Sequence, residues 1–143
     1  MILAQVFICG ADEIIQVWKL EEDGPTLEQE LSGHEERVLC LAITKDGRLV
    51  SGCEGGTLRY WSLSDGRCLQ VMDCQTVVDT ELRTSVTCVL ALPDRVIAAS
   101  SHFRSNQIKV WACDQRKIEK LFAEGVGRQR AICDVAKVIT KFL

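Results

Sequence analysis

The sequence predicts an all-β chain built from small antiparallel sheets that repeat along its length. Three observations support this fold class: one stretch holds four short apolar runs joined by turn residues, and tryptophans and cysteines each recur at similar intervals. Self-similarity at a fixed period is the signature of repeat architectures. The chain has 143 residues, 47% hydrophobic and 26% charged, which is a composition typical of a globular domain.

The stretch over residues 33–74 predicts one complete four-stranded unit. Its four runs have the usual strand length of about five or six residues. They span residues 38–43, 48–52, 57–61 and 68–72. Asp46-Gly47 and Asp65-Gly66 lie between runs and predict tight hairpin turns, because both central residues of such turns need φ > 0. The first run does not alternate, so we expect its strand to be covered on both faces.

Two independent sets of residues indicate that this unit repeats. Trp18, Trp61 and Trp111 stand 43 and 50 residues apart, each at the end of a similar phrase. Cys40, Cys88 and Cys133 stand 48 and 45 residues apart, each within an apolar run. Because the two sets are in phase, chance similarity is a poor explanation, and the sequence predicts an internal repeat.

The complete unit resembles a WD40 repeat, which forms one blade of a β-propeller. The resemblance is carried by Gly33-His34, Ser51-Gly52 and Thr57–Trp61, with an interval of 27 residues from His34 to Trp61. Repeats of this family are about 40–45 residues long. The resemblance implies a β-propeller-type arc of about three four-stranded antiparallel blades, of which the first is incomplete.

The expected arrangement is a single WD40-like domain over residues 1–143. Residues 1–31 form a partial blade and residues 33–74 the complete blade. Residues 75–124 form a third blade with longer loops, whose fourth strand is expected over 117–122. Residues 125–143 start a further strand at 131–136, followed by a tail to which no role is assigned.

Three blades are fewer than the roughly four to eight of closed propellers. An open arc exposes apolar sheet faces at its two ends, and such faces associate. Three explanations are open: the chain is a fragment of a longer propeller, two copies join into a six-blade ring as a homodimer, or the strand at 131–136 completes the first blade. The fragment explanation ranks first.

The resemblance also implies a buried hydrogen-bond relay, from a loop His through a strand Ser to a loop Asp, with a Trp indole at its edge. In the second blade His34, Ser51 and Trp61 match this pattern, but Gly55 stands where the Asp is expected. Each missing bond removes about 0.5–1.5 kcal/mol of stabilisation.

The other two blades keep less of the relay. The first has Asp12 and Trp18 in place but carries Ile8 instead of the Ser. The third keeps Trp111, while Leu82-Arg83 stands where Gly-His is expected. His34 is therefore interpreted as a structural loop histidine.

No motif in the chain predicts an enzyme, so catalytic residues, metals and cofactors are all expected to be absent. Ser51, His34 and Asp46 are the residue types of a hydrolytic triad but lack a nucleophile-elbow setting. No phosphate-binding glycine loop occurs, and the two histidines, His34 and His102, form no zinc-binding pair. The eight cysteines include no Cys-x-x-Cys pair and are interpreted as reduced thiols.

Charge and hydropathy limit the classes of partner and compartment. The net charge is −3 and the pI about 5.4, which argues against nucleic acid and acidic membrane surfaces as partners. No run approaches 18 apolar residues, and the start of the chain lacks the positive region of a signal peptide. We expect a cytoplasmic protein, with the nucleus as the alternative.

The resemblance implies a non-catalytic protein–protein interaction scaffold whose partners dock on a loop-lined face. On this chain that face carries Glu35, Glu36, Arg37, Arg83, His102, Phe103 and Arg104. Phe103 beside Arg104 is the leading candidate, since aromatic and Arg side chains are enriched at interface hot spots; the alternative is that Phe103 packs under its own loop. Two other functions are open: a regulatory or substrate-recognition segment of a multidomain enzyme, such as a ubiquitin ligase adaptor or signalling ATPase, and an RNA-binding propeller.

Overall fold

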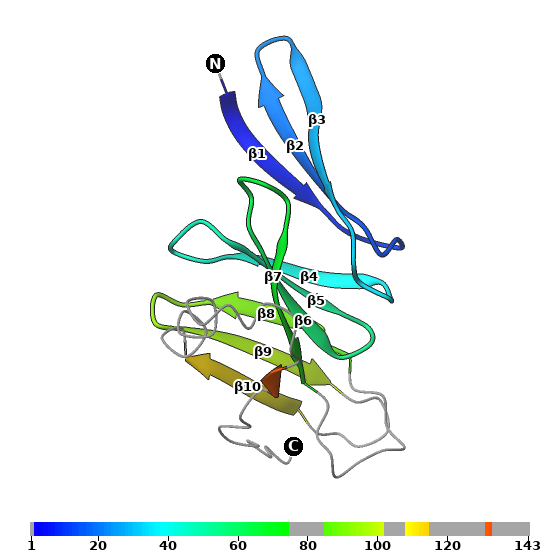
Figure 1. The fold of residues 1–143 in the computed structure, drawn as a ribbon, viewed down its shortest axis with the longest axis vertical. Helices are drawn as coiled ribbons and strands as arrows, with labels where there is room; N and C mark the ends of the chain where they lie inside the picture. The colour runs from blue at the N-terminus through cyan, green and yellow to red at the C-terminus, as the bar shows by residue number, and fades with distance from the viewer. Residues whose placement is uncertain (1, 75–84, 102–107, 115–130, 133–143) are drawn as a thin grey trace.

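The computed structural model describes residues 2–74, 85–101, 108–114 and 131–132, and these form three sheets arranged in an arc (Figure 1). Within these ranges every regular element is a strand, which confirms the expected all-β class. A helix long and apolar enough to cross a membrane is not found among the described residues.

Sheet A, at the top of Figure 1, is the three-stranded antiparallel sheet β1-β2-β3. Its strands are β1 (Ile2–Ile8), β2 (Ile15–Glu21) and β3 (Gly24–Leu31). Each pairs with the next in sequence, as expected for short connections. A bulge between Val17 and Trp18 shifts the register of β2 against β3.

Sheet B holds the complete four-stranded unit. Its antiparallel strands are β4 (Val38–Ile43), β5 (Leu49–Cys53), β6 (Thr57–Trp61) and β7 (Cys68–Asp73). A fifth short strand, β11 (Ala131–Ile132), lies parallel to the outer strand β7. Ala131 and Ile132 therefore neither begin a further blade nor complete sheet A; they occupy the outer edge of sheet B, where β7 presents free backbone groups.

Sheet C is the antiparallel sheet β8-β9-β10, at the bottom of Figure 1. Its strands are β8 (Cys88–Ala91), β9 (Arg95–Ser101) and β10 (Ile108–Asp114). β9 pairs with both neighbours, and Ala98 faces Val89 on one side and Trp111 on the other. The fourth strand expected over 117–122 and the remainder of 133–143 lie outside the described residues.

The two Asp-Gly turns of sheet B are longer than the two-residue turns that the dipeptides predict. In the first, the Thr44 amide donates to the Arg48 carbonyl at 2.9 Å, and the Gly47 amide donates to the Thr44 carbonyl at 3.0 Å. The buried Thr44 hydroxyl donates to the Asp46 carboxylate and accepts from the Arg48 amide. These side-chain bonds stabilise the wider loop, in which Gly47 has φ = 78°. In the second, the Ser62 amide donates to the Arg67 carbonyl at 2.9 Å.

Two apolar clusters join neighbouring sheets. Between sheets A and B, Ile15, Val17 and Leu31 contact Leu49 and Trp61. Between sheets B and C, residues of β5 to β7 contact residues before and within sheet C, and the largest of them are Val50, Leu58, Tyr60, Met72, Val86 and Val96. Each sheet is therefore stabilised mainly by burying a face against its neighbour.

Gly52 lies where β5 comes close to the segment before β8. A Cβ atom at position 52 would lie 2.5 Å from Val86 Cγ1 and 2.7 Å from Cys40 Sγ. Both distances are shorter than non-bonded carbon and sulfur atoms tolerate. Only glycine therefore allows the segment before β8 to pack directly on β5.

β4 is covered less completely than its unbroken apolar sequence predicts. Cys40 and Ala42 pack against the cluster between sheets B and C, and Leu41 packs toward sheet A. Leu39 and Ile43, however, are exposed. A first strand lies at the end of its blade, so only part of each face meets a neighbouring sheet among the described residues.

Candidate interaction surfaces

His34, Ser51 and Trp61 meet in a buried hydrogen-bonded group between sheets A and B. His34 Nε2 lies 2.6 Å from Ser51 Oγ, and the Trp61 indole donates to the same oxygen at 2.8 Å. Ser51 and Trp61 lie in the central strands β5 and β6, while His34 lies in the segment before β4. Gly33, with φ = 146°, brings that segment onto the Trp61 ring, since a Cβ there would lie 3.4 Å from Trp61 Cη2.

Burial determines the charge state of His34. Its side chain is only 5% exposed. Desolvation, with a smaller contribution from the Arg59 guanidinium, lowers the pKa of His34 to about 4. The ring is therefore neutral at pH 7, and its Nδ1 has no hydrogen-bond partner among the described residues.

The hydroxyl at the centre of this group is closed to solvent. Ser51 is completely buried, so a substrate cannot reach its hydroxyl. Asp46 bonds to Thr44 and forms an ion pair with Arg48 at 3.0 Å, within its own turn. Among the described residues, no three His, Cys, Asp or Glu side chains are grouped as metal ligands.

Position 55, where the relay pattern implies an Asp, is approached by another carboxylate. A Cβ atom on Gly55 would lie 3.4 Å from Glu36 Cδ and 3.5 Å from Glu36 Oε1. Glu36 comes from the same loop as His34, two residues further along. A side chain from the loop before β4 therefore lies where a side chain from the β5–β6 loop is missing.

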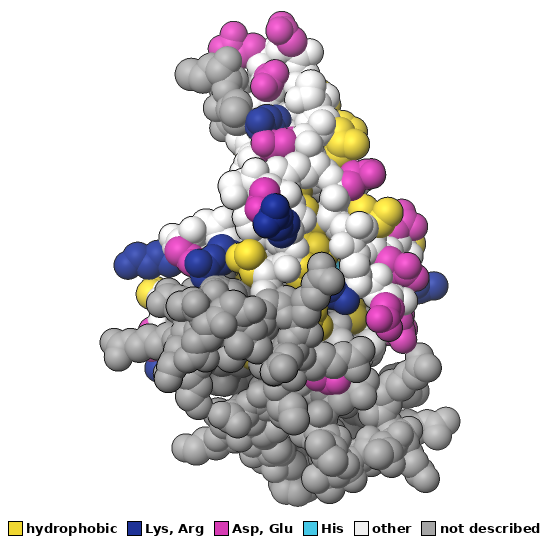
Figure 2. Space-filling view, in the orientation of Figure 1, with side chains coloured by type: hydrophobic (Ala, Val, Ile, Leu, Met, Phe, Trp, Pro, Cys, Tyr) yellow, Lys and Arg dark blue, Asp and Glu magenta, His cyan; other side chains and the backbone are white. Residues whose placement is uncertain are grey.

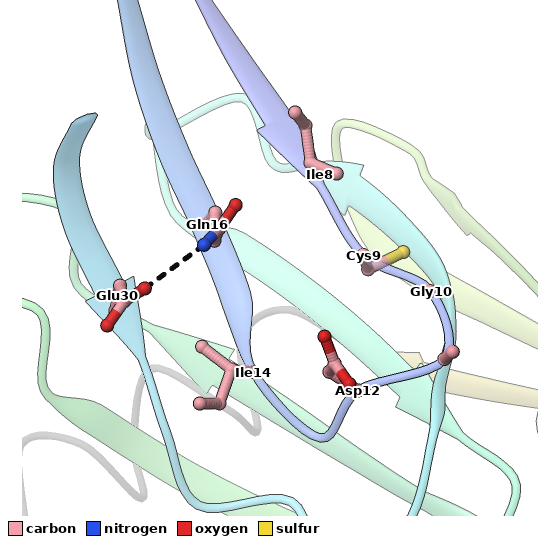
Figure 3. Close-up of a pocket in the computed structure, with 8 residues that line it drawn as sticks. Ile8, Cys9, Gly10, Asp12, Ile14, Gln16 and Glu30 are labelled. Atoms are coloured by element: carbon pink, nitrogen blue, oxygen red, sulfur yellow. Dashed lines mark hydrogen bonds between the residues drawn. The ribbon is translucent and has the colours of Figure 1, made fainter. Parts of the chain in front are cut away.

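In sheet A, Trp18 makes a different set of bonds. Its indole donates to Gln16 Oε1 at 3.3 Å, and the Gln16 amide donates to Glu30 Oε1 at 3.1 Å. Asp12 lies in the β1–β2 loop and, with Gln16 and Glu30, lines an open cavity of about 430 Å³ (Figure 3). Ile8, Cys9 and Ile14 contribute the apolar part of its wall.

The loop residues predicted to bind partners are only partly described. Glu35 and Arg37 are exposed beside His34, and Glu36 is half-buried. The Arg37 carbonyl accepts from the Glu54 amide at 2.9 Å, which joins the loop before β4 to the β5–β6 loop. Arg83, His102, Phe103 and Arg104, and the Trp111 side chain, lie outside the described part of the chain.

The outer face of sheet A is a second surface, and the sequence did not predict which residues form it. Register makes Val6, Trp18 and Leu27 neighbours on it, in the same order as Leu49, Trp61 and Cys68 on sheet B. Leu49 and Trp61 are at most 1% exposed, because sheet A covers them. Val6 is 37% and Leu27 46% exposed. Equivalent rows thus differ in whether a described sheet covers them.

Sheet C shows the same asymmetry at the other end of the arc. Cys40 on β4 contacts the Val86 carbonyl and lies partly buried between sheets B and C. Cys88 on β8 pairs with Ala99, and Ala99 with Val110, the residue before Trp111, so by register Cys88 corresponds to Ala42 and lies two residues from the place of Cys40, on the same face. Cys88 is exposed, and Leu90 is 53% exposed. The cysteine spacing therefore predicts the strand and the face but not the register, and whether a sheet covers that face depends on the neighbouring blade. Cys133 lies outside the described residues.

Comparisons with known proteins agree with this arrangement. The family model described as "WD domain, G-beta repeat" matches residues 25–62. Pleiotropic regulator 1 of Mus musculus is 38% identical over 64 residues, which are 45% of this chain and 12% of that protein. Apoptotic protease-activating factor 1 of Rattus norvegicus is 33% identical over 97 residues, 64% of this chain and 7% of that protein. The chain thus spans a small part of both relatives.

Solved structures show the same fold. The WD40 β-propeller domain of Doa1 superposes with a TM-score of 0.61 at 22% identity, over 80% of this chain and 34% of that one. The computationally designed protein Ika8 superposes with a TM-score of 0.57 at 23% identity, over 75% and 30%. The repeat match, the relatives and the fold together support a partial WD40 propeller of several blades.

Proposed function

We propose that this chain is a non-catalytic scaffold for protein–protein interactions, working in the cytoplasm or nucleus, and that it contributes its blades to a larger assembly. The observation that carries the proposal is the row Val6, Trp18 and Leu27. Sheet A buries Leu49 and Trp61 in the corresponding row of sheet B, whereas Val6 and Leu27 are exposed and Trp18 is half-buried. A face of this composition gains free energy when another sheet covers it.

The occupant that can be measured directly is a second copy. Among the described residues, each end of the arc carries exposed apolar side chains, Val6 and Leu27 on sheet A and Leu90 on sheet C. Contact between unlike faces is heterologous, and it closes into a ring if the rotation between copies allows. Two copies of about three blades would supply a six-blade ring, within the usual range of propellers.

Light scattering on a size-exclusion column, over a tenfold dilution, tests this assembly. We expect a species of twice the 15.9 kDa chain mass. Leu27→Glu should shift the equilibrium toward the single chain, because it places a charge in the contact. Thr26→Glu, a neighbouring exposed residue, is the matched control. A single-chain mass at every dilution, with reversible unfolding and no effect of Leu27→Glu, would contradict the proposal.

The loop-lined face is the proposed site for other proteins. Glu35 and Arg37 are its exposed charges among the described residues. Replacing Phe103 and Arg104 by alanine should lower the affinity for an identified partner in a pull-down without changing the unfolding midpoint. Unchanged affinity would exclude these two residues from the interface.

A regulatory segment of a larger protein is the second candidate. This candidate is favoured because the chain matches only a small part of much longer relatives. The matched regions are 12% of a pleiotropic regulator and 7% of a protease-activating factor. In that case the rest of the parent chain supplies the covering sheets. Detection of one longer polypeptide by an antibody against residues 33–74 would support this candidate over the independent scaffold.

A further inference from the structure

The acidic residues of the chain are concentrated in and beside sheet A. Residues 1–36 contain nine Asp or Glu and a single basic residue, Lys19. Residues 37–143 contain eleven Asp or Glu and sixteen Lys or Arg. Lys19 already pairs with Glu28 at 2.7 Å. Acidic side chains accordingly appear across sheet A in Figure 2. A surface of this charge attracts and orients positively charged partners.

Strand β1 is the outer strand of sheet A next to this charge. Among the described residues β1 pairs only with β2, and no described strand pairs with its other edge. Val6 and Ile8, on the outer face, are exposed. An open edge with apolar side chains beside it is the surface to which an extended peptide adds as a further strand.

The cavity at the end of β1 has the chemistry to take one basic side chain. Ile8 and Ile14 give it apolar walls, along which the methylene groups of Lys or Arg can lie. Asp12 and Glu30 contribute carboxylates from two different segments (Figure 3). Glu30 accepts one bond from Gln16, and a carboxylate has capacity for more.

The corresponding place on sheet B is occupied by a side chain from outside the sheet's central strands. By register Ile8 corresponds to Ser51, because Ile8 pairs with Gln16 two residues before Trp18, and Ser51 with Arg59 two residues before Trp61. On sheet B, His34 from the segment before the first strand contacts Ser51 there. On sheet A, the described residues leave this place as the cavity.

We propose that the β1 edge and this cavity bind an extended segment of a partner protein, in which aliphatic residues alternate with polar ones and one Lys or Arg side chain enters the cavity that Asp12 and Glu30 line. The inference rests on the proposed scaffold function and specifies the partner for one of its faces. Backbone bonds to β1 supply affinity, and the two carboxylates select the charged side chain.

The probe is the synthetic peptide acetyl-Val-Thr-Val-Arg-Val-Thr-Val-amide, titrated into the full ¹⁵N-labelled chain at low salt. We expect saturable amide shifts over residues 4–12 and at Gln16. Citrulline in place of arginine keeps the shape and removes the charge, and should weaken binding about three- to tenfold. N-methylation of alternate peptide amides should abolish binding, since it removes the donors that pair with β1.

Two double variants separate the cavity from general charge attraction. Asp12→Asn with Glu30→Gln should weaken binding of the arginine peptide by the same factor and leave the citrulline peptide unaffected. Glu22→Gln with Asp23→Asn removes equal charge from the exposed β2–β3 turn and should change neither. No binding, shifts confined to other strands, or equal losses in both double variants would overturn the inference. Self-association measured by light scattering would still stand in that case.

Discussion

His34 Nε2 lies 2.6 Å from the Ser51 hydroxyl, while Nδ1 of the same buried ring has no hydrogen-bond partner among the described residues. Ser51 Oγ also accepts the Trp61 indole hydrogen. A neutral imidazole has one donor and one acceptor nitrogen, so either tautomer leaves Nδ1 unsatisfied. The group thus joins the loop before β4, strand β5 and the Trp61 indole, but a hydrogen bond at His34 Nδ1 is missing among the described residues.

Gly55→Asp should supply that bond. The WD40 pattern implies an Asp at this position, whose carboxylate can accept from Nδ1–H. We expect urea unfolding to show a gain of about 0.5–1.5 kcal/mol in the free energy of unfolding. Because a Cβ here lies 3.4 Å from Glu36 Cδ, the Glu36 carboxylate has to shift.

Two controls isolate the new bond. Gly55→Ala removes the flexibility of glycine in the unfolded chain without adding an acceptor. In a His34→Gln background, Gly55→Asp should bring no gain beyond that of Gly55→Ala. An equal gain in both backgrounds would show that the aspartate acts without His34.

Acidification should destabilise the chain through His34. Its pKa is about 4 when folded and about 6.5 when unfolded, so the unfolded state binds the proton more readily. Stability from this group is complete above pH 6.5 and falls as the pH decreases toward 4. The loss between pH 6.5 and pH 5 should be about 1.5 kcal/mol. Urea unfolding at both pH values measures it, and His34→Gln should remove most of the slope.

The strands of sheet B are the part of the fold that local sequence predicts best. Val38–Ile43 and Thr57–Trp61 have the predicted bounds, because an apolar run between turn residues determines each of them. The turns themselves were predicted too short, because the Thr44 hydroxyl stabilises a wider loop. The meeting of His34, Ser51 and Trp61 at one site was expected only from the resemblance to the WD40 repeat, and the hydrogen bonds to Ser51 Oγ show that contact.

Features that depend on distant segments were not predictable in the same way. The parallel pairing of Ala131 with Met72 joins segments with no local signal for each other. The approach of Glu36 to Gly55 depends on how two loops pack. The exposure of Val6 and Leu27 depends on whether another sheet packs on them. The sequence pattern within one blade does not contain that information.

Gly52→Ala should be strongly destabilising. The added methyl group would lie 2.5 Å from Val86 Cγ1 and 2.7 Å from Cys40 Sγ, so sheets B and C must separate or shift. Overpacking of this kind costs about 1–3 kcal/mol or more. Gly10→Ala is the matched control, since no atom lies within 4 Å of a Cβ there, and thermal unfolding should change little. Val86→Ala should recover part of the loss in the double variant; losses that simply add would contradict this contact.

Cys40 and Cys88 should differ sharply in reactivity although both lie in the first strand of their sheets. Burial raises the pKa of the Cys40 thiol to about 12, which leaves almost no thiolate at pH 8. Cys88 is exposed. Brief treatment of the folded chain with iodoacetamide, followed by peptide mass mapping, should show Cys88 modified and Cys40 protected, and both modified in urea. Equal labelling of the folded chain would mean that sheet C does not cover Cys40. The same reaction also reports on assembly: if a further sheet covers sheet C, protection of Cys88 should rise with chain concentration while that of Cys40 stays constant.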